Sequence, residues 1–162
     1  GVDPAAMRDV GADLPVARVD SFGGTLLVAV NFLEHVSGAT PDIGTVAHLL
    51  DEVDASRLVA FTFDTLAAET DVHARVFDPQ ARGCERAASG VGVAACTAHL
   101  AEHAVFDGER EEIAVESGLF LDRPATVRAT VEAQPSVGGT ALTTLDGELA
   151  VPEDEDDGII EV

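Results

Sequence analysis

The stretch that decides the fold spans residues 82–103 and reads RGCERAASGVGVAACTAHLAEH. A polar loop of small residues leads directly into a segment that is apolar on nearly every side. A helix that is apolar all round is enclosed by other elements, whereas a surface helix keeps one polar face. The stretch therefore predicts a buried helix around which the rest of the chain is arranged.

The beginning of this helix combines a capping residue with two glycines. Ser89 is a natural N-cap, because its hydroxyl can accept a hydrogen bond from an amide in the first turn. Gly90 and Gly92 leave first-turn amides uncovered by side chains. Uncovered amides and the positive end of the helix dipole together favour a bound carboxylate or phosphate. Two interpretations stay open: an anion site at the helix start, or a cap and close packing alone.

The segments on either side have the composition of short strands and a second helix. The second helix is predicted to begin with Thr40 as its cap and Pro41 at its first position. A loop or short helix is expected at residues 32–39, and one helical turn within residues 1–13. Runs of β-branched and apolar residues bounded by turn residues predict strands at residues 16–19, 25–31, 58–63, 72–77, 113–116, 125–131 and 140–145, with a hairpin turn at Asp146 and Gly147 before residues 148–151.

About seven strands and two helices, one of them enclosed, predict an α+β fold. The arrangement expected is a curved sheet or open barrel around a central helix. A length of 162 residues suits one domain, which we place at residues 1–151. Residues 152–162 contain a run of like charges and are expected to form a loose acidic tail.

The charge of the chain is strongly unbalanced, with 30 acidic residues against nine basic ones, all arginine, and a net charge of -21. Such a charge repels phosphates and anionic lipids, so neither nucleic acid nor membrane is an expected partner. No apolar run is long enough to span a bilayer and no signal segment opens the chain, so a cytoplasmic location is expected. Acid excess without lysine is typical of a surface adapted to high salt, where screening shrinks to ~3 Å. Two cysteines, Cys84 and Cys96, are too few for a disulfide scaffold.

A competing motif lies near the end of the central helix, where residues 99–103 spell H-x-x-E-H, the pattern of inverted zinc proteases. Histidines at i and i+4 face the same way, so His99 and His103 could hold zinc with Glu102 as the base. A pattern of five residues recurs by chance and no third ligand downstream is apparent, so we expect a solvated helix end and no metal. Three further histidines are scattered and are expected at surface or core positions: His35, His48 and His73.

Five short motifs occur in series: HARVFDP at 73–79, ERAASG at 85–90, GLFLDRP at 118–124, VGG at 137–139 and GEL at 147–149. In order and spacing, from about residue 24 to residue 149, they resemble the PhzF-like family (phenazine biosynthesis F type) of the diaminopimelate epimerase superfamily. The resemblance implies two pseudo-symmetric halves, each a sheet wrapped around a central helix, with the active site in the cleft between them. This chain resembles only the second half.

The resemblance implies the activity of a cofactor-independent isomerase or epimerase that acts on a small amino- or hydroxy-acid-like compound. Members move a proton at carbon with a glutamate from the first half. The chain alone is therefore expected to be inactive and to need its own N-terminal half as a partner. A small carboxylate-bearing substrate is the other implied partner, and a homodimer is an alternative assembly. The contrasting hypothesis is a diverged, non-catalytic domain that binds a small acid or a partner protein.

The resemblance also assigns site residues in the loop before the central helix, which in the family commonly reads Glu-Asp-Pro-Ala-Thr-Gly-Ser. Glu85 matches the glutamate and Ser89 the threonine, so these two are the implied catalytic residues. Arg86 stands where the family has aspartate, which puts proton shuttling by this loop in question, as does the replacement of the family's serine by Val91. The residues implied to bind the substrate are Ser89, Gly90, Val91 and Gly92.

In the related two-thiol racemases, a catalytic cysteine precedes the first glycine of this helix. Ser89 occupies that place here, and neither Cys84 nor Cys96 aligns with it. A hydroxyl is a much poorer base than a thiolate near neutral pH, so thiol-type racemisation is not expected.

Overall fold

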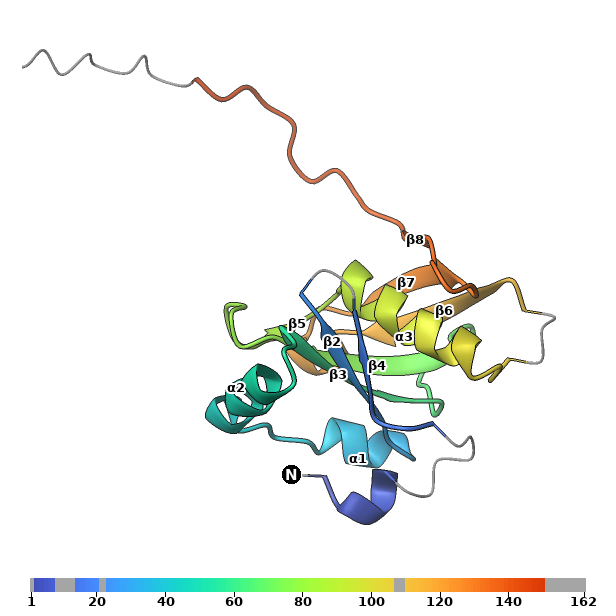
Figure 1. Ribbon diagram of the computed structural model, residues 1–162. Helices are drawn as coiled ribbons and strands as arrows, with labels where there is room; N and C mark the ends of the chain where they lie inside the picture. Colours follow the sequence, from blue (N-terminus) through green and yellow to red (C-terminus); the bar gives the residue numbers. More distant parts are fainter. Residues whose placement is uncertain (1, 8–13, 21–22, 107–109, 151–162) are drawn as a thin grey trace, which may run out of the picture.

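The computed structural model describes residues 2–7, 14–20, 23–106 and 110–150, whose strands form one curled sheet (Figure 1). Seven strands follow one another across it in the order β1 (Ala17–Val19), β2 (Thr25–Ala29), β3 (Arg57–Thr62), β4 (Val72–Phe77), β6 (Glu112–Ser117), β7 (Ala125–Thr130) and β8 (Val137–Gly138). The short strand β5 (Glu85–Arg86) lies off this path and pairs with β4. Two pairs, β2 with β3 and β4 with β6, are parallel, and the remaining pairs are antiparallel.

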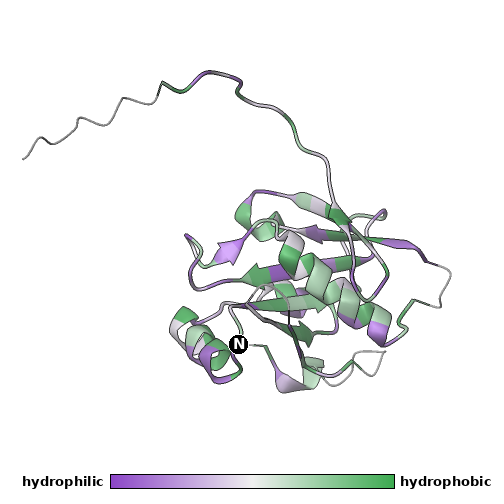
Figure 2. Ribbon diagram, turned by 45° about the horizontal axis from the view of Figure 1, so that its top comes forward, coloured by the Kyte–Doolittle hydropathy of each residue, from purple (hydrophilic) through white to green (hydrophobic). Residues whose placement is uncertain are grey.

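Helix α3 (Gly90–Glu102) lies against this sheet as its central helix (Figure 1). Its buried positions include Val93, Cys96 and Leu100, which pack in the same core cluster as apolar residues from β2, β3, β4, β6 and β7. Figure 2 shows the helix to be largely hydrophobic, with hydrophilic residues at its C-terminal end. The predicted α+β fold, a curved sheet around an enclosed helix, is confirmed.

The opposite face of the sheet is covered as well, so that β4 is buried along its whole length. Val72, Ala74 and Val76 belong to the core cluster around α3. Because side chains alternate along a strand, His73 and Arg75 point to the other face. There the guanidinium of Arg75 reaches two carbonyls at the end of α1 (Leu33–Ser37) and just beyond it. This second layer also includes α2 (Ile43–Glu52) and the 3-10 turn Leu119–Leu121.

The two predicted helix starts had different outcomes. Ser89 caps α3 as predicted, and its hydroxyl accepts a hydrogen bond from the amide of Gly92. For α2 the predicted cap, Thr40, was wrong: the cap is Asp42, whose carboxylate accepts from the amide of Thr45 at 2.7 Å. An aspartate side chain caps as well as a hydroxyl does, and its position three residues before Thr45 decides where the helix begins.

The C-terminal strands predicted at residues 140–145 and 148–151 are not formed. No strand occurs between residues 139 and 150, and Leu142, Leu145 and Leu149 are each at least 85% exposed. Figure 1 shows this segment running away from the sheet. The composition suits a strand, but a strand needs a neighbour to pair with, and the segment has none among the described residues. Residue 151 and the predicted acidic tail, 152–162, lie outside the described residues.

None of the helices in the described ranges is both long enough and apolar enough to cross a membrane.

Candidate functional site

The first turn of α3 leaves two backbone donors available. The amide of Gly92 donates to the Ser89 hydroxyl at 3.1 Å, and the amide of Val93 donates to the Ser89 carbonyl. The amides of Gly90 and Val91 have no hydrogen-bond partner within the described residues. Of the residues predicted to bind an anion, Gly92 therefore has its amide occupied by the cap, whereas the amides of Gly90 and Val91 stay available.

The two glycines of this turn serve different purposes. Gly90 is exposed, and a Cβ added to it would meet only a methyl of Val137, at 3.4 Å. Gly92 is buried, and an added Cβ would lie 3.3 Å from methyls of both Val59 and Val76. Gly92 thus lets α3 approach β3 and β4 closely, while Gly90 keeps the entrance to the helix start uncovered.

The loop before α3 is fixed by the end of β6. Ser117 donates from its hydroxyl to the carbonyl of Ala87 at 2.8 Å. Gly118 follows with a φ of 74°, and a Cβ there would lie 2.3 Å from the carbonyl oxygen of Arg123 and 2.6 Å from that of Ala87. No side chain fits at this contact, so Gly118 sets how closely the loop approaches β6.

Glu85, one of the two predicted catalytic residues, lies in a buried ion pair. Its two carboxylate oxygens accept from Nε and Nη2 of Arg75 at 2.9 and 2.8 Å. The two side chains are only 10% and 8% exposed. Arg75 also donates to the carbonyls of Val36 and Ala39, both at 2.8 Å. This bidentate pair fixes the beginning of the loop to the sheet, and Glu85 can exchange a proton only if the pair opens.

Arg86, which replaces the family's aspartate, turns toward Asp78. The guanidinium contacts the Asp78 carboxylate at 2.7 Å, and the amide of Gln80 donates to the same carboxylate at 2.9 Å. Burial acts to raise the pKa of Asp78, but these hydrogen bonds and the arginine charge outweigh it and lower the pKa. The pair therefore holds the β4–β5 turn, and neither partner is free to shuttle protons.

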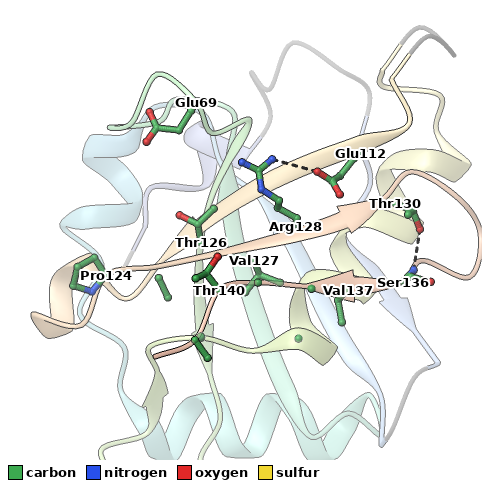
Figure 3. A pocket seen from close by; sticks show the side chains of 16 residues that line it. Glu69, Glu112, Pro124, Thr126, Val127, Arg128, Thr130, Ser136, Val137 and Thr140 are labelled. Atoms are coloured by element: carbon green, nitrogen blue, oxygen red, sulfur yellow. Dashed lines mark hydrogen bonds and ion pairs between the residues drawn. The ribbon is translucent and has the colours of Figure 1, made fainter. Parts of the chain in front are cut away.

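An open groove of about 1080 Å³ runs along β7 and β8 and reaches the start of α3 (Figure 3). Ala88 and Gly90 line it at the helix start, with Val137 beside them. The exposed ion pair of Glu112 and Arg128, at 3.2 Å, lies on its β6–β7 side. The uncovered helix start therefore opens into a space large enough for a small acid or for another protein segment.

A buried polar cluster on the other face of the sheet was missed by the sequence analysis. The carboxylate of Glu116 accepts from the amides of Leu66 and Ala67, the hydroxyl of Thr70, and Nδ1 of His73, all within 3.0 Å. Burial acts to raise the pKa of Glu116, but these hydrogen bonds together lower it. The only sequence signal was the presence of His73 and Glu116 within otherwise apolar strands.

The H-x-x-E-H residues are brought together at the C-terminal end of α3. One ligand atom from each of His99, Glu102 and His103 lies within 4.8 Å of the others. Glu102 and His103 are exposed, as expected for a solvated helix end. For His99 that expectation was wrong: only 2% of it is exposed, because the last turn of α3 still packs against the sheet. Of the other histidines, His73 is fully buried and the side chain of His48 is 77% exposed.

The two cysteines are free, and burial raises the pKa of Cys96 to about 12. Its thiol therefore stays protonated and is a poor nucleophile near neutral pH. Neither cysteine lies in the first turn of α3, and Ser89 is its N-cap, at the position where the resemblance to the two-thiol racemases places a cysteine.

One family model and several solved structures match the chain. The sequence model of that family, described as phenazine biosynthesis-like protein, matches residues 6–148. A PhzF-family phenazine biosynthesis protein from Bacillus anthracis is 20% identical, with a TM-score of 0.58 over 72% of this chain and 41% of that chain. A putative phenazine biosynthesis PhzC/PhzF protein from Clostridium difficile is 14% identical, with a TM-score of 0.59 over 93% of this chain and 53% of that chain.

A predicted epimerase from Pseudomonas aeruginosa is 23% identical, with a TM-score of 0.59 over 78% of this chain and 42% of that chain. No curated protein matches the chain. These structural likenesses show the fold alone. The chain spans about half the length of the solved structures it matches, and the matches do not themselves assign it to the second half.

Proposed function

The chain belongs to the phenazine biosynthesis-like family, and we propose that it is the substrate-binding half of a cofactor-independent isomerase. The substrate class proposed is a small amino- or hydroxy-acid-like compound. The observation that carries this proposal is the capped start of α3, where Gly90 lines the groove along β7 and β8. The same turn is the part of the sequence that resembles the substrate loop of the family.

The amides of Gly90 and Val91 are suited to hold the substrate carboxylate. Both point out of the first turn, where the helix dipole adds partial positive charge. Removing a proton from the carbon next to a carboxylate moves negative charge onto its oxygens. Donors that are already in place stabilise that charge without reorganising, which lowers the barrier to proton transfer.

The residues proposed as catalytic have distinct parts in this scheme. The Ser89 oxygen accepts from Gly92, which leaves its hydroxyl hydrogen free to donate to a bound substrate. Glu85 is held by Arg75, so its main effect is to position the loop, and it takes a proton only in a state where that pair opens. The glutamate that abstracts the proton is proposed to come from an N-terminal half.

Two features support the proposal of a missing half. The chain spans 41–53% of the length of the solved structures it matches. The segment from residue 139 to 150 leaves the sheet with Leu142, Leu145 and Leu149 exposed. A partner half that pairs with this segment would bury those leucines and close the groove over the start of α3. A homodimer would do the same through a second copy of the chain.

The binding step is tested by titrating the ¹⁵N-labelled chain with lactate, in high salt, and following its amide signals by NMR. We expect the signals of Gly90 and Val91 to shift most, and Gly90→Val to abolish the shift while the helix remains folded. Gly138→Val is the matched control, because it adds the same side chain in open space elsewhere in the groove. Shifts that leave residues 89–92 unchanged would mean that the helix start is only a cap.

The alternative is a diverged, non-catalytic domain that binds a small acid or a partner protein. It is favoured by the commitment of Arg86 to Asp78, which leaves no acid at the position where the family has aspartate. Expression together with the proposed N-terminal half distinguishes the two. Deuterium incorporated from solvent next to the carboxylate of a bound acid supports the isomerase, and binding without exchange supports the alternative.

A further inference from the structure

The sequence analysis expected no metal at residues 99–103, but the burial of His99 leads us to the opposite inference. We propose that the C-terminal end of α3 is a binding site for a divalent transition-metal ion of the zinc type. His99, Glu102 and His103 are its protein ligands. Their spacing of i, i+3 and i+4 places all three on one side of the helix. One ligand atom from each lies within 4.8 Å of the others, and the two imidazole rings are 4.6 Å apart between centroids.

His99 is the fixed ligand of this site. It is 2% exposed, and its Nε2 atom is buried without a hydrogen-bond partner in the described part of the chain. A buried nitrogen that lacks a partner is unfavourable, and coordination of a metal ion removes that cost. A metal ion binds the lone pair of an imidazole nitrogen, and Nε2 is the nitrogen of His99 that has no other partner among the described residues.

Glu102 and His103 are the adjustable ligands. Both are exposed, and neither side chain makes a hydrogen bond or ion pair with the residues that the structure describes. Zinc bonds of about 2.1 Å place two tetrahedral ligand atoms about 3.4 Å apart. Because the three ligand atoms here lie within 4.8 Å of one another, any two of them need to approach each other by at most about 1.4 Å. Rotation of two exposed side chains achieves this without moving the helix.

The donor set agrees with the proposed ion. Imidazole and carboxylate together suit zinc and its neighbours, whereas magnesium and calcium take oxygen ligands alone. Three protein ligands leave a fourth position for water or another small ligand. The site lies about 14–20 Å from the start of α3, since the helix rises about 1.5 Å per residue. It is therefore separate from the proposed substrate site, and either proposal can be wrong while the other holds.

The test is isothermal titration of the chelator-treated full chain with zinc chloride, in high salt with excess magnesium to occupy acidic groups. We expect one zinc ion per chain, and at least a tenfold loss of affinity in His103→Ala. Glu102→Gln should weaken binding less than His103→Ala, because the amide oxygen is a poorer ligand than the carboxylate but is still able to bind the ion. His103 is exposed, so its loss leaves the core intact, whereas His99→Ala opens a cavity and is not needed.

His48→Ala is the matched control. His48 is an exposed histidine on α2, with Glu52 four residues on at 3.7 Å but no second histidine beside it. Zinc affinity should be unchanged in this variant. Equal affinity in wild type and His103→Ala, or no binding to the wild type, would overturn the proposal. NMR signals of the His99 ring that shift with zinc in wild type and not in His103→Ala would give it independent support.

Discussion

The two faces of β4 are equally buried but are filled in opposite ways. Toward α3, the strand presents Val72, Ala74 and Val76, which belong to the apolar core cluster around the helix. Toward the outer layer it presents His73 and Arg75, each paired with a carboxylate from another strand. On the face of β4 toward α3, the size of the side chains therefore determines the packing. On the outer face, charge and hydrogen bonding determine it. The changes of salt, residue and pH described below test the contributions of the two faces.

The largest effect expected is loss of the whole fold in dilute buffer. Both faces stabilise the folded chain, but a net charge of -21 opposes compaction unless salt screens it. Because acid excess without lysine predicts a surface adapted to high salt, circular dichroism should show cooperative folding as salt is raised toward molar concentration. Full secondary structure in dilute buffer, with no change on adding salt, would contradict this prediction.

On the outer face, Arg75→Met should cost about 3–5 kcal/mol of folding free energy. It leaves the carboxylate of Glu85 buried without a partner, and the Val36 and Ala39 carbonyls without a donor. Urea unfolding in high salt measures the loss. Removing both charges together, with Arg75→Met and Glu85→Met, should recover part of it. Arg128→Met is the exposed control, and there the loss of the pair with Glu112 should cost about 1 kcal/mol or less.

On the inner face, Gly92→Ala should destabilise the protein by about 1–3 kcal/mol. The added methyl would lie 3.2 Å from the Ser89 hydroxyl oxygen and 3.3 Å from methyls of Val59 and Val76, so the cap or these side chains have to shift to make room for it. Gly90→Ala makes the same change two residues earlier, where the only contact is 3.4 Å to Val137. Its effect should stay within about 0.5 kcal/mol. Equal losses in the two variants, measured by urea unfolding, would show that close packing does not explain Gly92.

The packing on the inner face of β4 could be predicted from the sequence, whereas the contacts on its outer face could not. The enclosed helix and its Ser89 cap depend on neighbouring residues, so an apolar run and one hydroxyl were enough to predict them. The roles of His73 and Arg75 depend on Glu116 and Glu85, which are brought to β4 by strand pairing. The alternation in residues 72–77 was consistent with a half-exposed strand, and nothing local revealed a second covering layer.

The difference between local features and contacts made by distant residues also explains the other wrong predictions. Residues 140–145 have the composition of a strand but lack a partner strand, and β5 and β8, each of two residues, are too short to produce a pattern. At the candidate site, Ser89 and Gly90 were found because a cap and an exposed glycine are local features. Only the folded structure shows that Gly92 donates to the cap and that Glu85 is held by Arg75.

The smallest effect expected is on the pH dependence of stability, through Glu116. Hydrogen bonds to its carboxylate lower its pKa in the folded chain below the ordinary value of 4.5, although burial opposes this. The unfolded chain therefore binds the proton first as the pH falls. The stabilisation is complete above about 4.5 and is lost as the pH falls through the lower, folded pKa. Acidification over this range should steadily reduce the free energy of unfolding.

Glu116→Gln removes that contribution and should flatten the pH dependence below about 4.5, while also lowering stability at neutral pH. The second effect arises because the amides of Leu66 and Ala67 lose charged acceptors. Urea unfolding at a series of pH values, in high salt, compares the slopes. Glu112→Gln, in the same strand but exposed, should leave the slope as it is in the wild type. A wild-type slope in Glu116→Gln would mean that other carboxylates, such as Asp78, dominate acid unfolding and that the outer face of β4 does not depend on the charge of Glu116.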